Sequence, residues 1–271
     1  MIARIKVAPG VAPCAAAGGG GSVWVSEYGA PYLLRIDPKT NRVLSRTQIG
    51  FGACGLGVGA GSVWVEDTSS NTVSRVSVRT RKRIAIKVGA QPYDATFASG
   101  SAWATAYTAG ELDRIDPAEN RVVERFPLAT ATGVVGAFGS VWATGSDGVI
   151  RVDPGSNTVA ATIPLPSAAW TAASSDAVWI TSPAGLARID PVTNQVAATI
   201  TLPSPLGDPA VVGGQVWVPE IRRNAIAIVD ASSNRVVRTV KVGAGPFVVT
   251  EIAGEAWVPS WKGADIWRLR P

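Results

Sequence analysis

The sequence contains no histidine in 271 residues. Histidine is the side chain whose charge most readily changes near neutral pH, and it is the most frequent general base in enzymes. Any acid–base chemistry in this chain therefore falls to glutamate, aspartate or tyrosine. The two cysteines are too few for a disulfide framework and have no zinc-ligand spacing. A chain of this length buries an ample core without either device.

Long apolar runs and strong charge are also absent. No run reaches the ~18 apolar residues that indicate a membrane span, and segment 1–7 is too short for a secretory signal. The net charge is only +5 and is spread along the chain, apart from a cluster at Arg79, Arg81, Lys82 and Arg83. This excess is too diffuse to indicate a nucleic-acid partner. We expect neither nucleic-acid nor membrane partners, and a protein that is cytoplasmic as written or secreted if a signal peptide has been removed.

What the sequence has is a repeat. Tryptophans recur about every forty residues, at Trp24, Trp64, Trp103, Trp142, Trp179, Trp217 and Trp257. Each lies in a short phrase such as Gly-Ser-Val-Trp-Val at 21–25, and a second phrase, Arg-Ile-Asp-Pro, follows at 35–38 and in later units. A period near forty with several short strands per unit is typical of a β-propeller blade.

Each unit divides into four short strands. In the first unit, the second strand carries the Trp phrase, the third covers 33–36 and the fourth covers 42–47. The intervening Asp-Pro-x-Thr-Asn segment suits a tight hairpin turn, although the second unit has replaced it with residues 77–81. We predict an all-β, seven-bladed propeller with four antiparallel strands per blade, formed by residues 1–271 as one domain.

The two ends of the sequence predict how the ring closes. After Trp257 the chain reaches a third strand at 265–271, which leaves the last blade without a fourth. Residues 2–7 are similar to the fourth strand at 236–242. We therefore expect residues 1–8 to complete the last blade, which protects the ring against edge-to-edge pairing with other chains.

The phrases Val-Trp-Val-Ser-Glu at 23–27 and Arg-Ile-Asp-Pro-x-Thr-Asn at 35–41 resemble those of the streptogramin (virginiamycin B) lyases and the related YVTN-type propellers. The resemblance covers the whole chain and implies the propeller fold. It also implies an elimination that opens a cyclic depsipeptide antibiotic with the help of magnesium. In that family a histidine just before the first strand of a blade acts as the base, and a glutamate follows the Trp phrase.

This sequence lacks the family's histidine in every blade but retains acidic residues near the glutamate position. The histidine position holds, in blade order, Cys14, Cys54, Tyr93, Thr132, Ala169, Gly207 and Phe247. Acidic residues remain near the glutamate position in three blades, as Glu27, Glu66 with Asp67, and Glu220. Without the histidine base, the family reaction lacks its proton acceptor. We expect no streptogramin lyase activity by that mechanism.

The loops before the first strand and after the second strand emerge on one face, around the mouth of the central channel. Their residues differ from blade to blade, which a binding site requires and blade architecture does not. We predict a small-molecule pocket there, lined by Cys14, Tyr28, Cys54, Tyr93, Asp94, Trp170, Phe247 and Trp261. Aromatic walls with a few carboxylates are typical of such sites. The alternative is that these loops are only variable and solvated.

Chemistry at this mouth would depend on acids and tyrosines. The candidate catalytic residues are Glu27, Asp67, Tyr107 and Glu220. The acids Glu27, Glu66 and Glu220 come from different blades and would surround the opening, where their mutual repulsion favours a cation among them. We predict that they bind a divalent metal, for which Mg²⁺ is the candidate because it prefers oxygen ligands, or a cationic or polyhydroxyl ligand. Independent carboxylates in bulk water are the alternative.

The cysteines are one repeat apart and occupy equivalent positions on neighbouring blades. Three interpretations remain open for Cys14 and Cys54: two buried, unpaired thiols, a disulfide across the mouth, or a reactive or metal-binding pair. We favour unpaired thiols, because free cysteine is commonly buried and inert. A disulfide needs the two Cα atoms within about 7 Å.

Three classes of function follow from these observations. The first is a monomeric binding module that holds a small molecule at the channel mouth. The second is an enzyme of lyase or cyclase type that uses carboxylates and tyrosines in natural-product chemistry. The third is a scaffold for protein interactions that uses the rim. Carboxylates within hydrogen-bond reach of a tyrosine or of each other would favour the enzyme.

Overall fold

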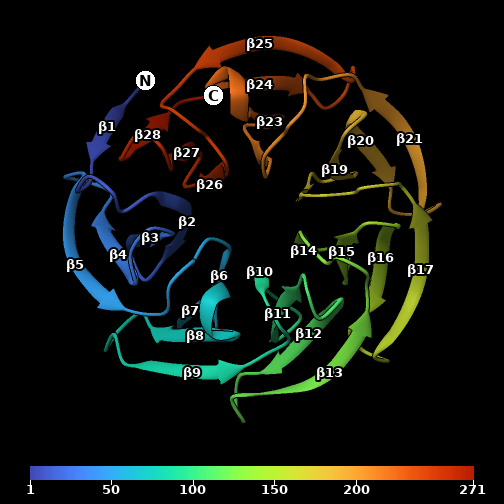
Figure 1. Cartoon of the computed structure of the whole chain (residues 1–271). Coiled ribbons are helices and arrows are strands. Elements are labelled where there is room, and N and C mark those ends of the chain that lie inside the picture. Colours follow the sequence, from blue (N-terminus) through green and yellow to red (C-terminus); the bar gives the residue numbers. More distant parts are fainter.

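The computed structural model describes residues 1–271 and confirms the predicted architecture. Seven four-stranded antiparallel sheets are arranged as blades around one axis (Figure 1). Blade one consists of β2 (Pro13–Gly19), β3 (Ser22–Glu27), β4 (Tyr32–Asp37) and β5 (Arg42–Gln48). Blade two consists of β6 (Leu56–Gly59), β7 (Ser62–Asp67), β8 (Thr72–Ser77) and β9 (Arg83–Lys87). Blade three consists of β10 (Pro92–Ala98), β11 (Ser101–Ala106), β12 (Glu111–Asp116) and β13 (Arg121–Pro127).

The next blades repeat this order. Blade four consists of β14 (Val134–Ala137), β15 (Ser140–Gly145), β16 (Gly148–Asp153) and β17 (Thr158–Pro164). Blade five consists of β18 (Thr171–Ala173), β19 (Val178–Ser182), β20 (Gly185–Asp190) and β21 (Gln195–Ile200). Blade six consists of β22 (Ala210–Val212), β23 (Gln215–Glu220), β24 (Ala225–Asp230) and β25 (Arg235–Lys241). Short 3-10 helices occur at Thr68–Ser70 and Ile221–Arg223.

Blade seven joins the two ends of the chain. It consists of β26 (Thr250–Ile252), β27 (Glu255–Ser260), β28 (Asp265–Leu269) and, as its outer strand, β1 (Ala3–Lys6). β1 runs antiparallel to β28, with Ile5 opposite Ile266, and Figure 1 shows the two termini beside this blade. The predicted strand exchange is confirmed.

The second strand of each blade is buried along nearly its whole length, because neighbouring blades cover both of its faces. A short continuous apolar run such as Val-Trp-Val is the pattern that such a strand needs. Each repeat tryptophan is at most 1% exposed, and the hydrophobic clusters lie between adjacent blades. None of the helical segments is long and apolar enough to cross a bilayer.

In four blades the repeated arginine of the third strand bonds the turn of the next blade. Arg151, for example, lies 5.0 Å from the ring centre of Trp142 in its own blade. Its Nη1 donates to the carbonyl of Pro191 at 2.7 Å and to Asn194 Oδ1 at 3.0 Å, both in the turn of blade five. The Arg-Ile-Asp-Pro phrase and the later asparagine are therefore two halves of one contact between blades.

Where one half of this contact is missing, the bond between the blades is missing too. Blade six has Ile228 opposite Trp217, the position at which the other blades have arginine. Blade seven has no turn for it to reach, since its fourth strand comes from the N-terminus. Blade two has lost the proline and asparagine, with Arg81 in the left-handed conformation at φ 63°, and Arg35 of blade one bonds only to Ser22.

Candidate functional site

A cavity of about 140 Å³ opens at the inner edge of the ring. Its walls come from blades one, two, three, five and seven, so residues from opposite sides of the ring converge there. The lining residues are Cys14, Tyr28, Gly52, Cys54, Glu66, Thr68, Tyr93, Trp170, Phe247 and Trp261.

Aromatic rings in mutual contact form most of the wall. Trp170 stacks on Tyr93 with ring centres 5.6 Å apart and meets Phe247 edge-on at 4.9 Å. Tyr28 of blade one and Trp261 of blade seven pack edge to face at 5.9 Å. Such contacts hold large rings in fixed positions, so the cavity has a preformed apolar wall.

The structure places seven of the eight predicted ligand-binding residues on this cavity. The eighth, Asp94, lies below it in the central channel. The sequence interpretation missed Gly52 and Thr68. Gly52 has no side chain that would mark it as a site residue. Thr68 closes the wall by donating to the carbonyls of Gly52 at 3.0 Å and Pro92 at 2.8 Å.

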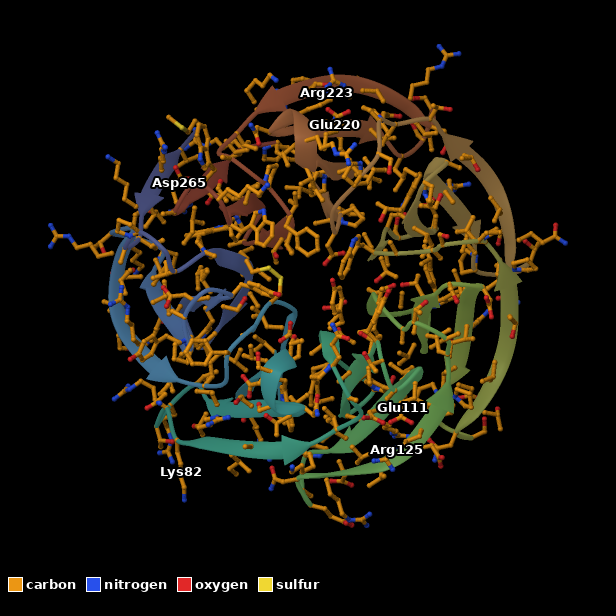
Figure 2. The ribbon with its side chains drawn as sticks, viewed as in Figure 1. Lys82, Glu111, Arg125, Glu220, Arg223 and Asp265 are labelled. Carbon is orange, nitrogen blue, oxygen red and sulfur yellow. A yellow bond between two sulfur atoms is a disulfide. The ribbon has the colours of Figure 1, made fainter.

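Cys14 and Cys54 form a disulfide, which corrects our preferred interpretation of two unpaired thiols. The equivalent positions on adjacent blades bring the two Cα atoms to 5.0 Å, well inside the range that a disulfide requires. Figure 2 shows the bond in yellow near the inner edge of the ring. The sulfur atoms are part of the cavity wall and pack against Ala15 and Val248.

Glu66 is the one carboxyl group on the cavity. It is fully buried, and its Oε1 accepts backbone N–H bonds from Cys54 at 2.6 Å and Gly55 at 2.8 Å. Its Oε2 has no partner. Burial raises the pKa of Glu66 well above its ordinary value, and the charges of Asp67 and Asp94 raise it further.

None of the four candidate catalytic residues lines the cavity. Asp67 accepts bonds from Gly50 N at 2.8 Å and Ser74 Oγ at 2.5 Å and pairs with Arg83 at 3.2 Å, so its contacts stabilise the fold. Tyr107 is exposed and contacts the far side of the Tyr93 ring.

Glu220 lies apart from the channel mouth. It pairs with Arg223 at 3.2 Å, and Figure 2 shows these two side chains together, away from the disulfide. The fourth candidate, Glu27, is fully buried, and neither of its carboxyl oxygens has a hydrogen-bond partner.

No group of three or more cysteine, aspartate and glutamate side chains is arranged to hold a metal ion. Glu27, Glu66 and Glu220 end three separate strands or lie next to the strand end, and the contacts above hold the last two toward their own blades. The residues present therefore do not fit a shared magnesium site. Binding of Mg²⁺ by a single carboxylate and water stays a prediction.

Two further acids, Asp94 and Asp208, line the central channel. Asp94 accepts N–H bonds from Ala95 at 2.8 Å and Val134 at 2.9 Å, and burial raises its pKa to about 7. Asp208 is at the equivalent position of blade six, and burial together with the charge of Asp94 raises its pKa well above the ordinary value. The sequence interpretation missed Asp208, although the repeat alignment that selected Asp94 also contained it.

Replacement of Glu27 by glutamine is expected to stabilise the fold above neutral pH. Burial, only partly opposed by Arg46, raises the pKa of Glu27 from 4.5 to about 7. Between these values the folded state keeps a proton that the unfolded chain has released, so the free energy of unfolding falls as pH rises through this window. With allowance for solvent screening, Glu27→Gln should recover about 2 kcal/mol at pH 8 and little at pH 4.

Urea unfolding of both proteins at the two pH values measures this difference. Glu119→Gln, in an exposed ion pair with Arg121, serves as the control that should show no such window. Equal stabilities of wild type and Glu27→Gln at pH 8 would show that Glu27 ionises without cost.

Comparison with solved structures places this ring among known propellers. Streptogramin B lyase superposes with a TM-score of 0.86 at 16% identity, over 99% of this chain and 96% of the lyase chain. A catalytically inactive histidine-to-alanine variant of virginiamycin B lyase from Staphylococcus aureus, with quinupristin, gives 0.85 at 16% identity, over 99% and 98%.

The chain has the fold of streptogramin B lyase. A lyase-like propeller is not thereby a lyase, since hydrazine synthase of Kuenenia stuttgartiensis also matches, with a TM-score of 0.75 at 14% identity over 98% of this chain and 97% of its own. Residues 44–162 match a repeat of unknown function, DUF6923. No curated protein matches the sequence. The shared fold therefore does not define the function, which depends on the residues of the site.

Proposed function

We propose that this lyase-like propeller is a binding protein whose mouth cavity holds one ring-sized, largely apolar group of a small molecule. The observation that carries the proposal is the preformed wall of five aromatic side chains and a disulfide around about 140 Å³. An apolar cavity of about 150 Å³ accommodates a benzene-sized guest. A larger ligand would insert one ring and leave the remainder on the rim.

Binding is favoured over catalysis because the candidate catalytic acids and tyrosine lie outside this cavity. The chain has no histidine, and the only cavity carboxyl, Glu66, bonds backbone N–H groups and has no basic partner. An elimination needs a base beside the substrate. Incubation with a streptogramin B antibiotic should therefore leave the depsipeptide ring intact, which mass spectrometry can follow.

The disulfide supports one of the two locations expected from the sequence. Disulfides persist in oxidising compartments and are rare in the cytosol. We therefore favour an exported protein over a cytoplasmic one.

Loss of a wall ring should weaken binding of a small aromatic probe. With α-methylstyrene followed by ligand-observed NMR, Phe247→Ala is expected to raise the Kd roughly tenfold, since a ring contact contributes about 1–2 kcal/mol. Phe138→Ala, the same change at an exposed turn outside the cavity, should leave the Kd unchanged. Absence of saturable binding to wild type, or equal Kd values for both variants, would overturn the proposal.

A further inference from the structure

In other blades of this ring, the position equivalent to Glu66 holds a hydroxyl group that links two neighbouring blades. The residue two after the repeat tryptophan is a hydroxyl in blades one, three, four and five. Ser26 Oγ accepts an N–H bond from Ala15 at 3.2 Å and donates to the carbonyl of Cys54, in the next blade, at 2.6 Å. One hydroxyl thus serves as acceptor within its blade and as donor to the neighbour.

Blades three and four repeat the arrangement. Thr105 Oγ1 accepts from Asp94 N at 3.0 Å and donates to the carbonyl of Thr132 at 2.6 Å. Thr144 Oγ1 accepts from Gly133 N at 2.8 Å and donates to a carbonyl of blade five. The position therefore requires a group that both accepts and donates.

Glu66 meets only the first half of this requirement within the protein. Its Oε1 accepts from Gly55 N, the bond equivalent to those of Ser26 and Thr105, and also from Cys54 N. Its Oε2 is buried without a partner and belongs to a residue that lines the cavity. A neutral carboxyl group has one O–H donor, and in Glu66 this donor has no acceptor within the protein.

The groups that face Glu66 favour the neutral form. Asp67 lies next to it on β7, and Asp94 and Tyr93 face it from blade three. Arg83, the cation of this blade that reaches the region, is already paired with Asp67. A second negative charge without a cation in an apolar wall would be costly, and burial accordingly raises the pKa of Glu66.

We propose that Glu66, as a neutral carboxylic acid, turns its buried Oε2 toward a ligand in the mouth cavity, donates a hydrogen bond to it and selects ring groups that carry a carbonyl-type acceptor. The ligand class is thus an aryl or similarly sized cyclic ketone, aldehyde, ester or lactone. This inference rests on the proposed binding function and adds the chemistry of recognition. A buried donor left without an acceptor disfavours a ligand of the same shape that lacks the oxygen.

Two probes of nearly equal shape test the donor. Acetophenone and α-methylstyrene differ in one position, where the first has a carbonyl oxygen and the second a methylene group. The measured quantity is the ratio of their Kd values in each protein, because this ratio cancels the contribution of the shared ring. Benzylammonium serves as a cationic third probe.

Two substitutions of Glu66 separate the donor from the packing. In Glu66→Thr the hydroxyl should bond the backbone as in the other blades, so the preference for acetophenone should fall roughly tenfold, the worth of one hydrogen bond. Glu66→Gln keeps an acceptor for the two N–H groups and a donor toward the cavity, so it should retain the preference. In wild type the preference should decline toward alkaline pH as Glu66 ionises, whereas Glu66→Gln should show no decline.

The outcomes distinguish this inference from the function on which it rests. If α-methylstyrene binds wild type and Phe247→Ala weakens it, the cavity is a binding site. An acetophenone preference that is then equal in wild type and Glu66→Thr, or stronger binding of benzylammonium than of acetophenone, overturns the role of Glu66 alone. If neither neutral probe binds, both proposals fail.

Discussion

Removal of residues 1–8 is expected to lower the free energy of unfolding by about 5 kcal/mol through lost apolar burial and lost backbone hydrogen bonds. β1 is the outer strand of blade seven, and its Ile5 is buried in a cluster that spans blades seven and one. Burial of an isoleucine side chain stabilises a fold by about 2 kcal/mol. The deletion also removes the backbone bonds from Ile2 and Val7 to the last hairpin.

The deletion also removes an ion pair between a half-exposed arginine and a buried aspartate. Arg4 contacts the carboxylate of Asp265 at 2.5 Å, and Asp265 is only 1% exposed. Without β1, Asp265 keeps Trp267 Nε1 as a side-chain donor and becomes open to water at the uncovered edge of β28, so the loss of this pair costs about 1 kcal/mol. The open edge of β28 then becomes available to other chains.

Thermal unfolding and gel filtration measure both effects. We expect a Tm at least about 10 °C lower than that of the full chain, together with self-association. Two restorations serve as controls: a synthetic peptide of residues 1–8 added in trans, and a permuted chain in which these residues follow Arg270 through an Asp-Pro-x-Thr-Asn turn. A deleted chain that melts within about a degree of the full chain would show that β1 contributes nothing to closure.

The fold was predictable because its causes recur in the sequence. Seven copies of the Trp phrase make the strand assignment clear. The contact of the arginine with the next turn, which four blades make, gives both phrases one physical reason. The departures were readable too, since Ile228 replaces arginine where the next blade has no turn to meet it. The repeat therefore indicates the fold, and the interruption of the repeat indicates where the ring closes.

The composition of the cavity wall could be predicted, but the state of its polar groups could not. Tyr93, Trp170 and Phe247 were visible as departures from the repeat consensus at one end of the blades. Glu27 and Glu66 are buried because the second strands of their blades extend through them, and the alignment does not encode where a strand ends. The expected ring of exposed acids is instead a set of buried ones.

Loss of the Cys14–Cys54 disulfide is expected to lower the free energy of unfolding by about 4 kcal/mol. The two cysteines are 40 residues apart, so the bond closes a loop that comprises most of blade one. Closing a loop of this length in the unfolded chain costs it conformational entropy worth about 4 kcal/mol in the chain-entropy model. The bond acts where blades one and two meet at the cavity.

Single and double cysteine variants test the disulfide, because one cysteine alone cannot form it. Cys14→Ala, Cys54→Ala and the double variant should each lose about the same stability, because each removes the same bond. Two unpaired thiols would instead give two small losses that add in the double variant. Chemical denaturation of the four proteins, with and without a reductant, measures the pattern.

Reduction provides the matched control within one sequence. A reductant should destabilise wild type to nearly the level of the double variant and leave the double variant unchanged. Since both sulfur atoms belong to the cavity wall, the reduced protein should also bind α-methylstyrene more weakly, as its wall loses a fixed link between two blades. Additive single losses with no effect of reductant would mean that the thiols are unpaired, and the argument for an oxidising compartment would fall with the bond.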